Sequence, residues 1–540
     1  MSIASALQSA QQKVAAAYTA CNSKGATMPA AGSQNLSNLP ATINSISSGP
    51  GEYDVEYMTY SSVSTENEQT SDTENASVLS IDSKTLSSST TQLPLFDAAP
   101  FNINKDSLFA VLRIPQSVNT LKEYAFYYCR EVRIINGLEH IEYMGNFAFN
   151  YTNNLRQPIY MPKLKGMSST NSTLALRTFD NSAITTVRSL GSITGLAGNS
   201  GGGVFYNCKN LTYVQLPSTL VSIGQMAFGN CTALTTVNLN NLPNLTYIGV
   251  SAFQGCTALT GVVHLPALTT LGHMAFKGTK ITSVTNLGSI TDIYGTSSNG
   301  TFEGCTSLAS VVLPETITYV GQRTFYGCTA LTSCNFPVSL VRIQAAAFQN
   351  TRITTLDLTG SSVMTLDNDC FRATTALTTV KLPKNTVLSN GFQFAEQGGN
   401  SYNATTAAAL DYDIDLSNSA TTTLSACTFY RSKIVRFVAP SGLTTIAAAN
   451  SNRGVFEGSA YLLEVDLPST LTTIGTRAFR DCNHMTTLTC RATTPPTFGS
   501  YALTNTSALA HIYVPSDSVA AYKAASGWSS FAAKISAITE

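Results

Sequence analysis

The amino-acid sequence predicts a β-rich solenoid of about fifteen stacked turns. One phrase recurs through most of the 540 residues with a base period of 23. Each copy contains a short segment in which apolar and polar residues alternate, which is typical of a strand with one buried face. Because one copy cannot bury its apolar side alone, stacked copies are needed to form a continuous core.

The repeat is followed through one phenylalanine per copy, the anchor Phe. The phrase "MAFGNCTALTTVNL", starting at Met226, returns as "SAFQGCTALTGVVHL", "TFEGCTSLASVVL" and "TFYGCTALTSCNF". The anchors are Phe126, Phe149, Phe179, Phe205, Phe228, Phe253, Phe276, Phe302, Phe325, Phe348, Phe371, Phe394, Phe429, Phe456, Phe479 and, weakly, Phe498. Eight of the fifteen intervals are 23 residues, so the period belongs to the fold and longer intervals are insertions.

Each copy predicts one strand and one return segment. A large aliphatic residue stands six positions after the anchor, as in Leu234 and Leu331, and opens the alternating segment. A proline such as Pro217 or Pro468 commonly ends it, because a missing N–H stops ladder pairing. A second apolar pair, as in "STLVSIG", then leads back to the next anchor.

A cysteine three residues after the anchor predicts a small buried filler. It occurs at Cys129, Cys208, Cys231, Cys256, Cys305, Cys328 and Cys482. The same position is Thr152, Ser182, Thr279, Thr351, Thr374, Ser432 and Ser459 in other turns. Since Thr or Ser replaces a filler but neither a disulfide partner nor a zinc ligand, we expect reduced thiols and no bound metal or other cofactor.

The pattern in "LTYVQLPSTLVSIGQMAFGNCTAL", Leu211 to Leu234, resembles the BspA-type leucine-rich repeat. The resemblance covers roughly residues 105–490. It implies a right-handed solenoid and a role in adhesion or recognition rather than catalysis. Residues 491–540 are similar to the closing cap of such proteins, with a final strand and a short helix. We expect this small α/β cap because an open last turn would expose core and strand edge.

Two segments precede the repeats. Residues 1–48 predict helices, with a heptad seam running from Ile3 to Cys21. The seam favours either a coiled coil between sister chains, of which a trimer is suspected, or packing on the second helical stretch "NLPATINSI". These residues resemble the leader of predicted bacteriophage tail or fibre proteins of gut bacteria. Residues 49–104 predict a polar linker that contains strand-like alternation.

The charge composition and the targeting signals limit the classes of partner that we expect. The formal net charge is zero and only 11% of residues are charged, so the electrostatic drive for nucleic-acid or anionic-lipid binding is missing. No segment is long and apolar enough for membrane insertion, and the first twenty residues do not form a signal peptide. We therefore expect a product made in the cytoplasm that leaves by cell lysis.

The sequence offers little for catalysis. The five histidines are scattered, and the one G-x-S-x-G match, around Ser200, lacks the strand and helix that a nucleophile elbow needs. Three polar insertions fall at the same phase, just before an anchor. They contain Asn199 and Ser200; Tyr294, Ser298 and Asn299; and Asn452 and Arg453. Loops on a rigid scaffold often carry recognition, although such loops are also simply tolerated.

The outward side of the predicted strand row is the other candidate surface. It is predicted to contain Tyr213, Gln215, Asn238, Asn335, Asp357, Lys381, Arg436, Glu464 and Asp466. Hydroxyls, amides and a few charges are suited to contact with a glycan or a protein. The same composition is typical of a strand face that contacts only solvent.

These observations favour a non-enzymatic recognition or structural protein. The main hypothesis is a phage virion fibre or receptor-binding component that contacts a host cell-surface protein or glycan and attaches to other virion proteins through residues 1–48. The alternative is a BspA-type adhesin on the bacterial cell surface. A serine hydrolase is a distant third.

Overall fold

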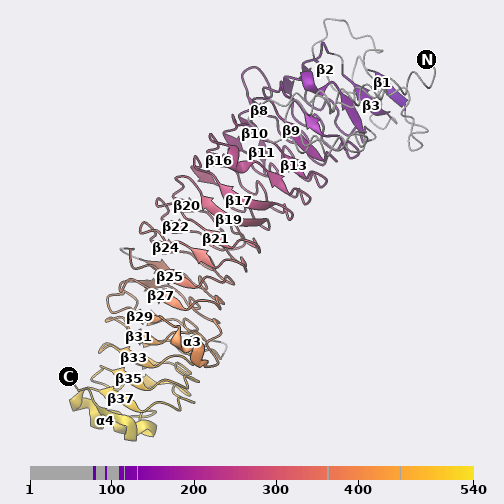
Figure 1. The fold of residues 1–540 in the computed structure, drawn as a ribbon. Helices are drawn as coiled ribbons and strands as arrows, with labels where there is room; N and C mark the ends of the chain where they lie inside the picture. Colours follow the sequence, from indigo (N-terminus) through magenta and orange to yellow (C-terminus); the bar gives the residue numbers. More distant parts are fainter. Residues whose placement is uncertain are drawn as a thin grey trace, which may run out of the picture. The chain divides into compact units, whose positions relative to one another are not determined.

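The computed structural model describes residues 77–80, 92–93, 109–114, 116–130, 132–361, 364–450 and 452–539. Contacts divide the chain into two units, 1–76 and 77–540, and all described residues belong to the second. The seam from Ile3 to Cys21 and the stretch "NLPATINSI" lie outside the described residues. The second unit is a parallel solenoid whose turns follow one another along one axis (Figure 1), so the predicted fold class is confirmed.

Two rows of short parallel strands run the length of this unit. The first row contains β1 (Ser77–Ser80), β3 (Phe109–Arg113), β5 (Ile134–Asn136), β7 (Ile159–Tyr160), β9 (Thr186–Ser189), β13 (Tyr213–Val214), β15 (Thr236–Val237), β17 (Thr260–His264), β19 (Lys280–Asn286), β21 (Ser310–Val311), β23 (Ser333–Cys334), β25 (Thr355–Asp357), β27 (Thr379–Lys381), β29 (Asp413–Asp415), β31 (Arg436–Val438), β33 (Glu464–Leu467), β35 (Thr487–Cys490), β37 (His511–Val514) and β38 (Ile535–Ala537).

The second row contains β2 (Gln92–Leu93), β4 (Thr120–Leu121), β6 (Tyr143–Met144), β8 (Thr173–Leu174), β10 (Gly195–Leu196), β14 (Ser222–Ile223), β16 (Tyr247–Ile248), β18 (Thr270–Leu271), β20 (Asp292–Ile293), β22 (Tyr319–Val320), β24 (Arg342–Ile343), β26 (Thr365–Leu366), β28 (Val387–Leu388), β30 (Thr423–Leu424), β32 (Thr445–Ile446), β34 (Thr473–Ile474) and β36 (Thr497–Phe498).

The short helices are η4 (Leu138–His140), η5 (Leu239–Asn241), α3 (Ala404–Ala408), η6 (Ser516–Ser518), α4 (Val519–Ala524) and η7 (Ser529–Lys534).

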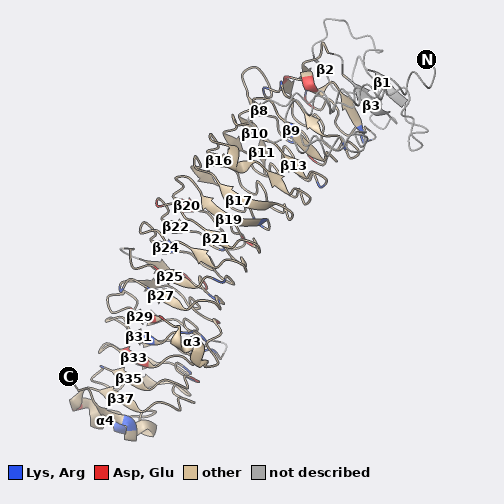
Figure 2. Ribbon diagram, in the orientation of Figure 1, with Lys and Arg blue, Asp and Glu red and all other residues tan. Residues whose placement is uncertain are grey.

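Pairing in both rows joins most strands to the equivalent strand of the next turn, so that each row consists of several consecutive parallel sheets. Tyr213 pairs with Thr236 and Val214 with Val237 in the first row. The second row has seventeen strands among the described residues, more than the expected fifteen turns. The first addition is at the start, where β1 and β2, within the expected linker, pair with β3 and β4. Charged side chains are sparse along the ribbon (Figure 2).

A tight corner around each anchor Phe forms a third hydrogen-bonded column. At Phe228, the residues two positions before and after, Met226 and Asn230, have φ values of 53° and 59°. The later position is Gly or Asn in many turns, residue types that tolerate this left-handed backbone. The N–H groups of these three residues donate to carbonyls of the following turn at 2.7–3.0 Å. Non-local backbone bonding therefore continues through a segment that is not a strand.

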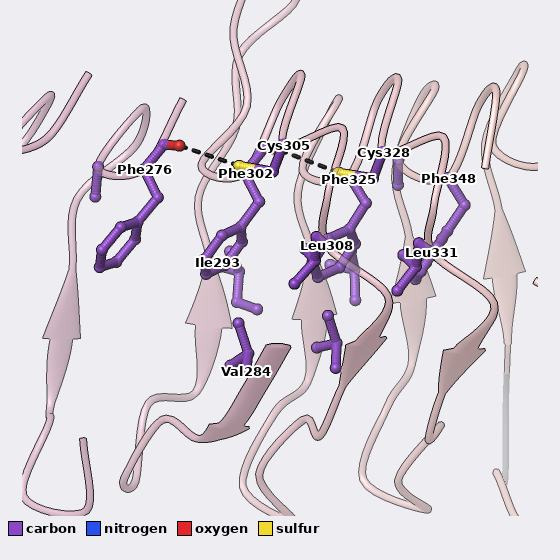
Figure 3. Close-up of a cluster of buried hydrophobic side chains, with 14 of the residues drawn as sticks. Phe276, Val284, Ile293, Phe302, Cys305, Leu308, Phe325, Cys328, Leu331 and Phe348 are labelled. Carbon is purple, nitrogen blue, oxygen red and sulfur yellow. Dashed lines mark hydrogen bonds between the residues drawn. The ribbon is translucent and has the colours of Figure 1, made fainter. Parts of the chain in front are cut away.

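The anchor side chains form one buried column. Fifteen described phenylalanines, from Phe126 to Phe479, stack on their neighbours with centroids 5.0–5.8 Å apart. Figure 3 shows Phe276, Phe302, Phe325 and Phe348 beside aliphatic core residues such as Ile293 and Leu308. Rings at this separation are offset, which avoids the repulsion of a direct face-to-face sandwich. The column and the aliphatic residues form one continuous core.

The filler position beside this column ties turns together. The thiols that donate to the anchor carbonyl of the preceding turn, at 2.9–3.2 Å, are Cys208, Cys231, Cys256, Cys305, Cys328 and Cys482. The hydroxyls that instead donate to the anchor carbonyl of their own turn, at 2.7–2.9 Å, are Thr152, Thr279, Thr351 and Thr374. Both kinds of side chain are buried, and each supplies a donor for a buried carbonyl.

The C-terminal end differs from the expectation in one respect. Phe498 is wrong as a last anchor, because it pairs with Ile474 in the second strand row. The anchor position is Leu503, which is buried and follows Tyr501, whose φ of 62° marks the corner. The repeat register thus continues past residue 490 to β37. A cap of α4, η7 and β38 follows, in which buried Trp528 donates to the Pro496 carbonyl at 2.9 Å.

Candidate recognition surface

The outward residues of the first strand row form what we call the outer strand face. In its early turns the Tyr213 hydroxyl donates to Oε1 of Gln215 at 2.6 Å. Asn238 and Asn335 use their amides differently. Each accepts a backbone N–H and donates to the carbonyl of the same residue in the preceding turn, Leu216 or Leu313, at 2.6–2.9 Å. These two amides clamp adjacent turns, so part of their hydrogen-bonding capacity is already used within the chain.

The later turns of the outer strand face carry ion pairs between neighbouring turns. Lys381 pairs with Asp411 at 2.9 Å, and this partner raises the pKa of Lys381. Arg436 lies 3.4 Å from Glu464. Asp466 accepts two hydrogen bonds from Arg491, both at 2.8 Å. These pairs are largely exposed, so each adds little to stability, yet together they fix the pattern of charge that a partner meets.

Asp357 forms its hydrogen bonds within its own turn. Its carboxylate accepts from the hydroxyl of Thr359 at 2.7 Å and from the backbone N–H of Thr359 at 3.1 Å. These two hydrogen bonds lower the pKa of Asp357, so it stays ionised near neutral pH. Of the nine outer-face residues expected from the sequence, the structure therefore gives partners within the chain to all.

The three insertions fold as small antiparallel hairpins. They are β11 (Gly198–Asn199) with β12 (Gly202–Gly203), the Gly295–Gly300 bridge and the Asn450–Arg453 bridge. They follow the second-row strands β10, β20 and β32, so they share one phase of the turn. The stems lie close to the following turn, since a Cβ added to Gly295 would be 1.7 Å from the Gln322 carbonyl oxygen.

Two of these hairpins are held by a glutamate one residue after the anchor. Glu303 accepts from Gly300 N–H at 2.9 Å, and Glu457 accepts from Gly454 N–H at 2.8 Å. Desolvation alone would raise the pKa of Glu303, but hydrogen bonds from Arg323 and the Gly300 N–H outweigh it and lower the pKa. The carboxylate is therefore charged and fixes the hairpin base.

Ser200 lies at the exposed tip of the first hairpin. Among the described residues no base bonds to it, and the Asn199 side chain accepts from Gly201 N–H at 2.8 Å instead. Tyr294 is 62% exposed at the base of the second hairpin. The Asn299 side chain there accepts from the Lys277 ammonium at 2.5 Å, and in the third hairpin Arg453 pairs with Glu396 at 3.1 Å.

A half-buried aromatic cluster on the early corners was missed by sequence reasoning. Tyr124 stacks on Phe147 at 5.0 Å, and Tyr128 stacks on Tyr151 at 4.5 Å. Tyr127 meets Tyr128 edge to face at 4.4 Å. The signal was available, because "EYAFYYC" and "NFAFNYT" place aromatic residues at equivalent positions around two consecutive anchors.

Within the part of the chain that the structure describes, no three His, Cys, Asp or Glu side chains are grouped to hold a metal ion. The described helices are also too short or too polar to cross a bilayer. The geometry defines a leucine-rich solenoid with a polar outer strand face and hairpins at one phase.

The family model for the BspA type leucine-rich repeat region matches residues 105–200, 172–297, 296–404 and 422–526. The chain belongs to this family. No curated protein matches it.

Solved structures of leucine-rich repeat proteins are similar to this chain. A leucine-rich repeat protein from Bacteroides ovatus is 17% identical, with 83% of this chain and 88% of that chain covered and a TM-score of 0.35. A leucine rich cell surface protein from Faecalibacterium prausnitzii is 20% identical, with 68% and 89% covered and a TM-score of 0.31. A leucine-rich repeat protein from Eubacterium ventriosum is 17% identical, with 56% and 79% covered and a TM-score of 0.32.

Proposed function

We propose that this protein is a recognition protein that binds a glycan or protein on a cell surface through its outer strand face. The observation that carries the proposal is the register of that face. Polar and charged side chains from different turns, such as Tyr213, Lys381 and Arg436, stand outward on strands that each pair with the strand of a neighbouring turn. A rigid row binds an extended partner without an ordering cost on its own side.

Binding of the labelled full-length chain to gut bacterial cells tests this function. We expect saturable binding that Tyr213→Ala and Lys381→Ala weaken, because both side chains lie on the outer strand face. Tyr501→Ala is the matched control, since Tyr501 is also exposed, at 63%, but lies at a corner. Loss of binding after periodate treatment of the cells identifies a glycan, and loss after protease treatment identifies a protein. Equal binding by all three variants contradicts the proposal.

Two sites of action fit a recognition protein of this family. The first is the bacterial cell surface, where the chain acts as an adhesin. The second is a phage virion, in which residues 1–48 attach the solenoid to the particle or to sister chains. The observation that favours the second is the leader-like sequence of residues 1–48 with its heptad seam.

The oligomeric state and location distinguish these two proposals. If the chain is a virion fibre, light scattering gives a trimer for the full-length chain and a monomer when residues 1–48 are removed. Peptides of the chain are then found by mass spectrometry in purified particles. Their recovery only from washed cell envelopes favours the adhesin and contradicts the virion proposal.

A further inference from the structure

A depression lies at the edge of the outer strand face, where β9, β13 and β15 of three consecutive turns end. The depression has a volume of about 280 Å³. The middle turn contributes Gln215 and Ser218 to its lining, one neighbour contributes Arg188 and Ser189, and the other contributes Asn238 and Asn241. The last of these residues belongs to η5, an insertion that the flanking turns lack at this position. The hollow therefore follows from local departures in a regular stack.

The side chains in this depression present hydrogen-bond donors. Tyr213 donates to Oε1 of Gln215 at 2.6 Å, which directs the amide N–H groups of Gln215 to other partners. The Ser189 oxygen accepts from Gly191 N–H at 3.3 Å, so its hydroxyl hydrogen remains able to donate. Asn238 is occupied by the backbone of Leu216. An acceptor-rich ligand is the complement of this arrangement.

The charge of the depression is positive and uncompensated. Arg188 is exposed and takes part in no ion pair among the described residues. The sequence contains no Asp or Glu from Asn181 to Thr291, and Figure 2 accordingly shows no red from β9 to β19. The arginine of a later turn, Arg491, is instead held by Asp466. The guanidinium of Arg188 can therefore form two parallel hydrogen bonds to an anion, but no carboxylate of the described residues occupies that position.

We propose that this depression binds an acidic saccharide, with Arg188 on its carboxylate or sulfate group. The planar guanidinium matches either anion with two parallel N–H bonds. The ring of Tyr213, 36% exposed beside Gln215, offers an apolar face on which a sugar ring packs. Hydroxyl and amide groups of the lining suit the sugar hydroxyls. The inference rests on the proposed function, because it names the ligand class of the same face.

Equilibrium binding of the full-length chain to three soluble polysaccharides tests this site. The probes are polygalacturonate for the carboxylate, dextran sulfate for the sulfate and dextran as the neutral match. We expect binding to one or both acidic probes and none to dextran. Arg188→Gln weakens that binding roughly tenfold or more, the loss of a charge-assisted hydrogen-bond pair. The affinity of Arg188→Lys should lie between those of the parent and Arg188→Gln, because lysine keeps the positive charge but cannot form two parallel hydrogen bonds to one anion.

The matched control is Arg352→Gln, which removes the same charge from an exposed arginine that has no ion pair among the described residues. We expect this variant to bind within about twofold of the parent, since charges beyond a Debye length are screened. An equal loss in Arg352→Gln and Arg188→Gln indicates non-specific charge attraction and overturns the proposal. Undiminished binding by a folded Arg188→Gln chain, or no binding to either acidic probe, also overturns it.

Failure of this site is distinguishable from failure of the proposed function. If Arg188→Gln binds cells as the parent does while Tyr213→Ala does not, the face recognises its partner without this anion contact. That partner is then a neutral glycan or a protein surface. Thermal melting of each variant, with an unchanged midpoint expected because Arg188 is exposed, shows that the chain is folded.

Discussion

A buried thiol has two roles in this fold, as filler and as donor. Cys328 is fully buried and donates to the Phe302 carbonyl of the preceding turn at 3.1 Å. We expect Cys328→Ala to lower the free energy of unfolding by about 1–3 kcal/mol, because it leaves a cavity and removes one of the two hydrogen bonds that the Phe302 carbonyl accepts, the other coming from the Cys305 N–H. Cys328→Thr should cost less, since Thr occupies the same position in other turns. Urea unfolding of both variants measures the difference, and equal losses contradict the donor role.

The same burial makes the thiols unreactive. It raises the pKa of Cys305 to about 11, so about one thiol in a thousand is ionised at pH 8. In a Cys21→Ser background, which removes the cysteine outside the described residues, we expect a thiol reagent to label the folded chain slowly. The eleven described cysteines should react once guanidinium unfolds the chain. Rapid labelling of several thiols in the folded state contradicts this expectation.

The hairpin is the element whose stability depends on one carboxylate. Glu303 has a lowered pKa, so its contribution is present above the unfolded value of 4.5 and is lost as the pH falls through the folded value. We expect Glu303→Gln to destabilise the chain by about 1 kcal/mol at pH 7. The difference from the parent should shrink as the pH falls below 4.5 and the folded carboxylate becomes protonated.

The control for this prediction is Glu315→Gln, because Glu315 is exposed and has no ion pair among the described residues. Hydrogen exchange at Gly300 gives a local measurement. Its N–H should exchange faster in Glu303→Gln at pH 7 and at the parent rate in Glu315→Gln. Unchanged protection in Glu303→Gln would show that the stem glycines alone hold the hairpin.

Repeating elements were predictable because the same residue types recur at the same phase. The anchor column, the first strand row and the phase of the hairpins follow from the 23-residue register, whereas the second strand row lies in what was expected to be a return segment. The weak anchor failed because Phe498 was chosen for its aromatic ring, whereas position in the turn places Leu503 there. The clamps at Asn238 and Asn335 were not predicted, because an outward amide that bonds to the neighbouring backbone has the same pattern as one that faces solvent.

The candidate site was less predictable than the fold. Gln215 was expected on the outer strand face, but Arg188 and the depression were not, because a hollow arises from how η5 and its neighbours depart from the repeat. The ion pairs, such as Arg491 with Asp466, join residues 25 positions apart. Asp466 pairs in the ladder with Thr489, so Arg491 reaches it diagonally from two positions further along the next turn.

At the scale of the whole solenoid, stability is expected to be local because each turn contacts its neighbours. Trp528 is fully buried in the cap, and we expect Trp528→Ala to cost about 3–5 kcal/mol. Hydrogen exchange should become faster in β37 and β35 and stay unchanged in β13 and β15. Trp528→Phe, which keeps a ring and loses the bond to Pro496, should show a smaller effect. Faster exchange along the entire solenoid contradicts local behaviour.

The column of stacked anchor rings also sets a constant spacing between turns. Successive anchors are 5.0–5.8 Å apart whatever the insertions between them, as in the 35 residues from Phe394 to Phe429. Duplicating or deleting one whole 23-residue unit would change the reach of the protein by one ring step and leave every other face aligned. Recombination between copies can therefore change the length of such a chain. The exposed residues that determine binding vary independently in each turn.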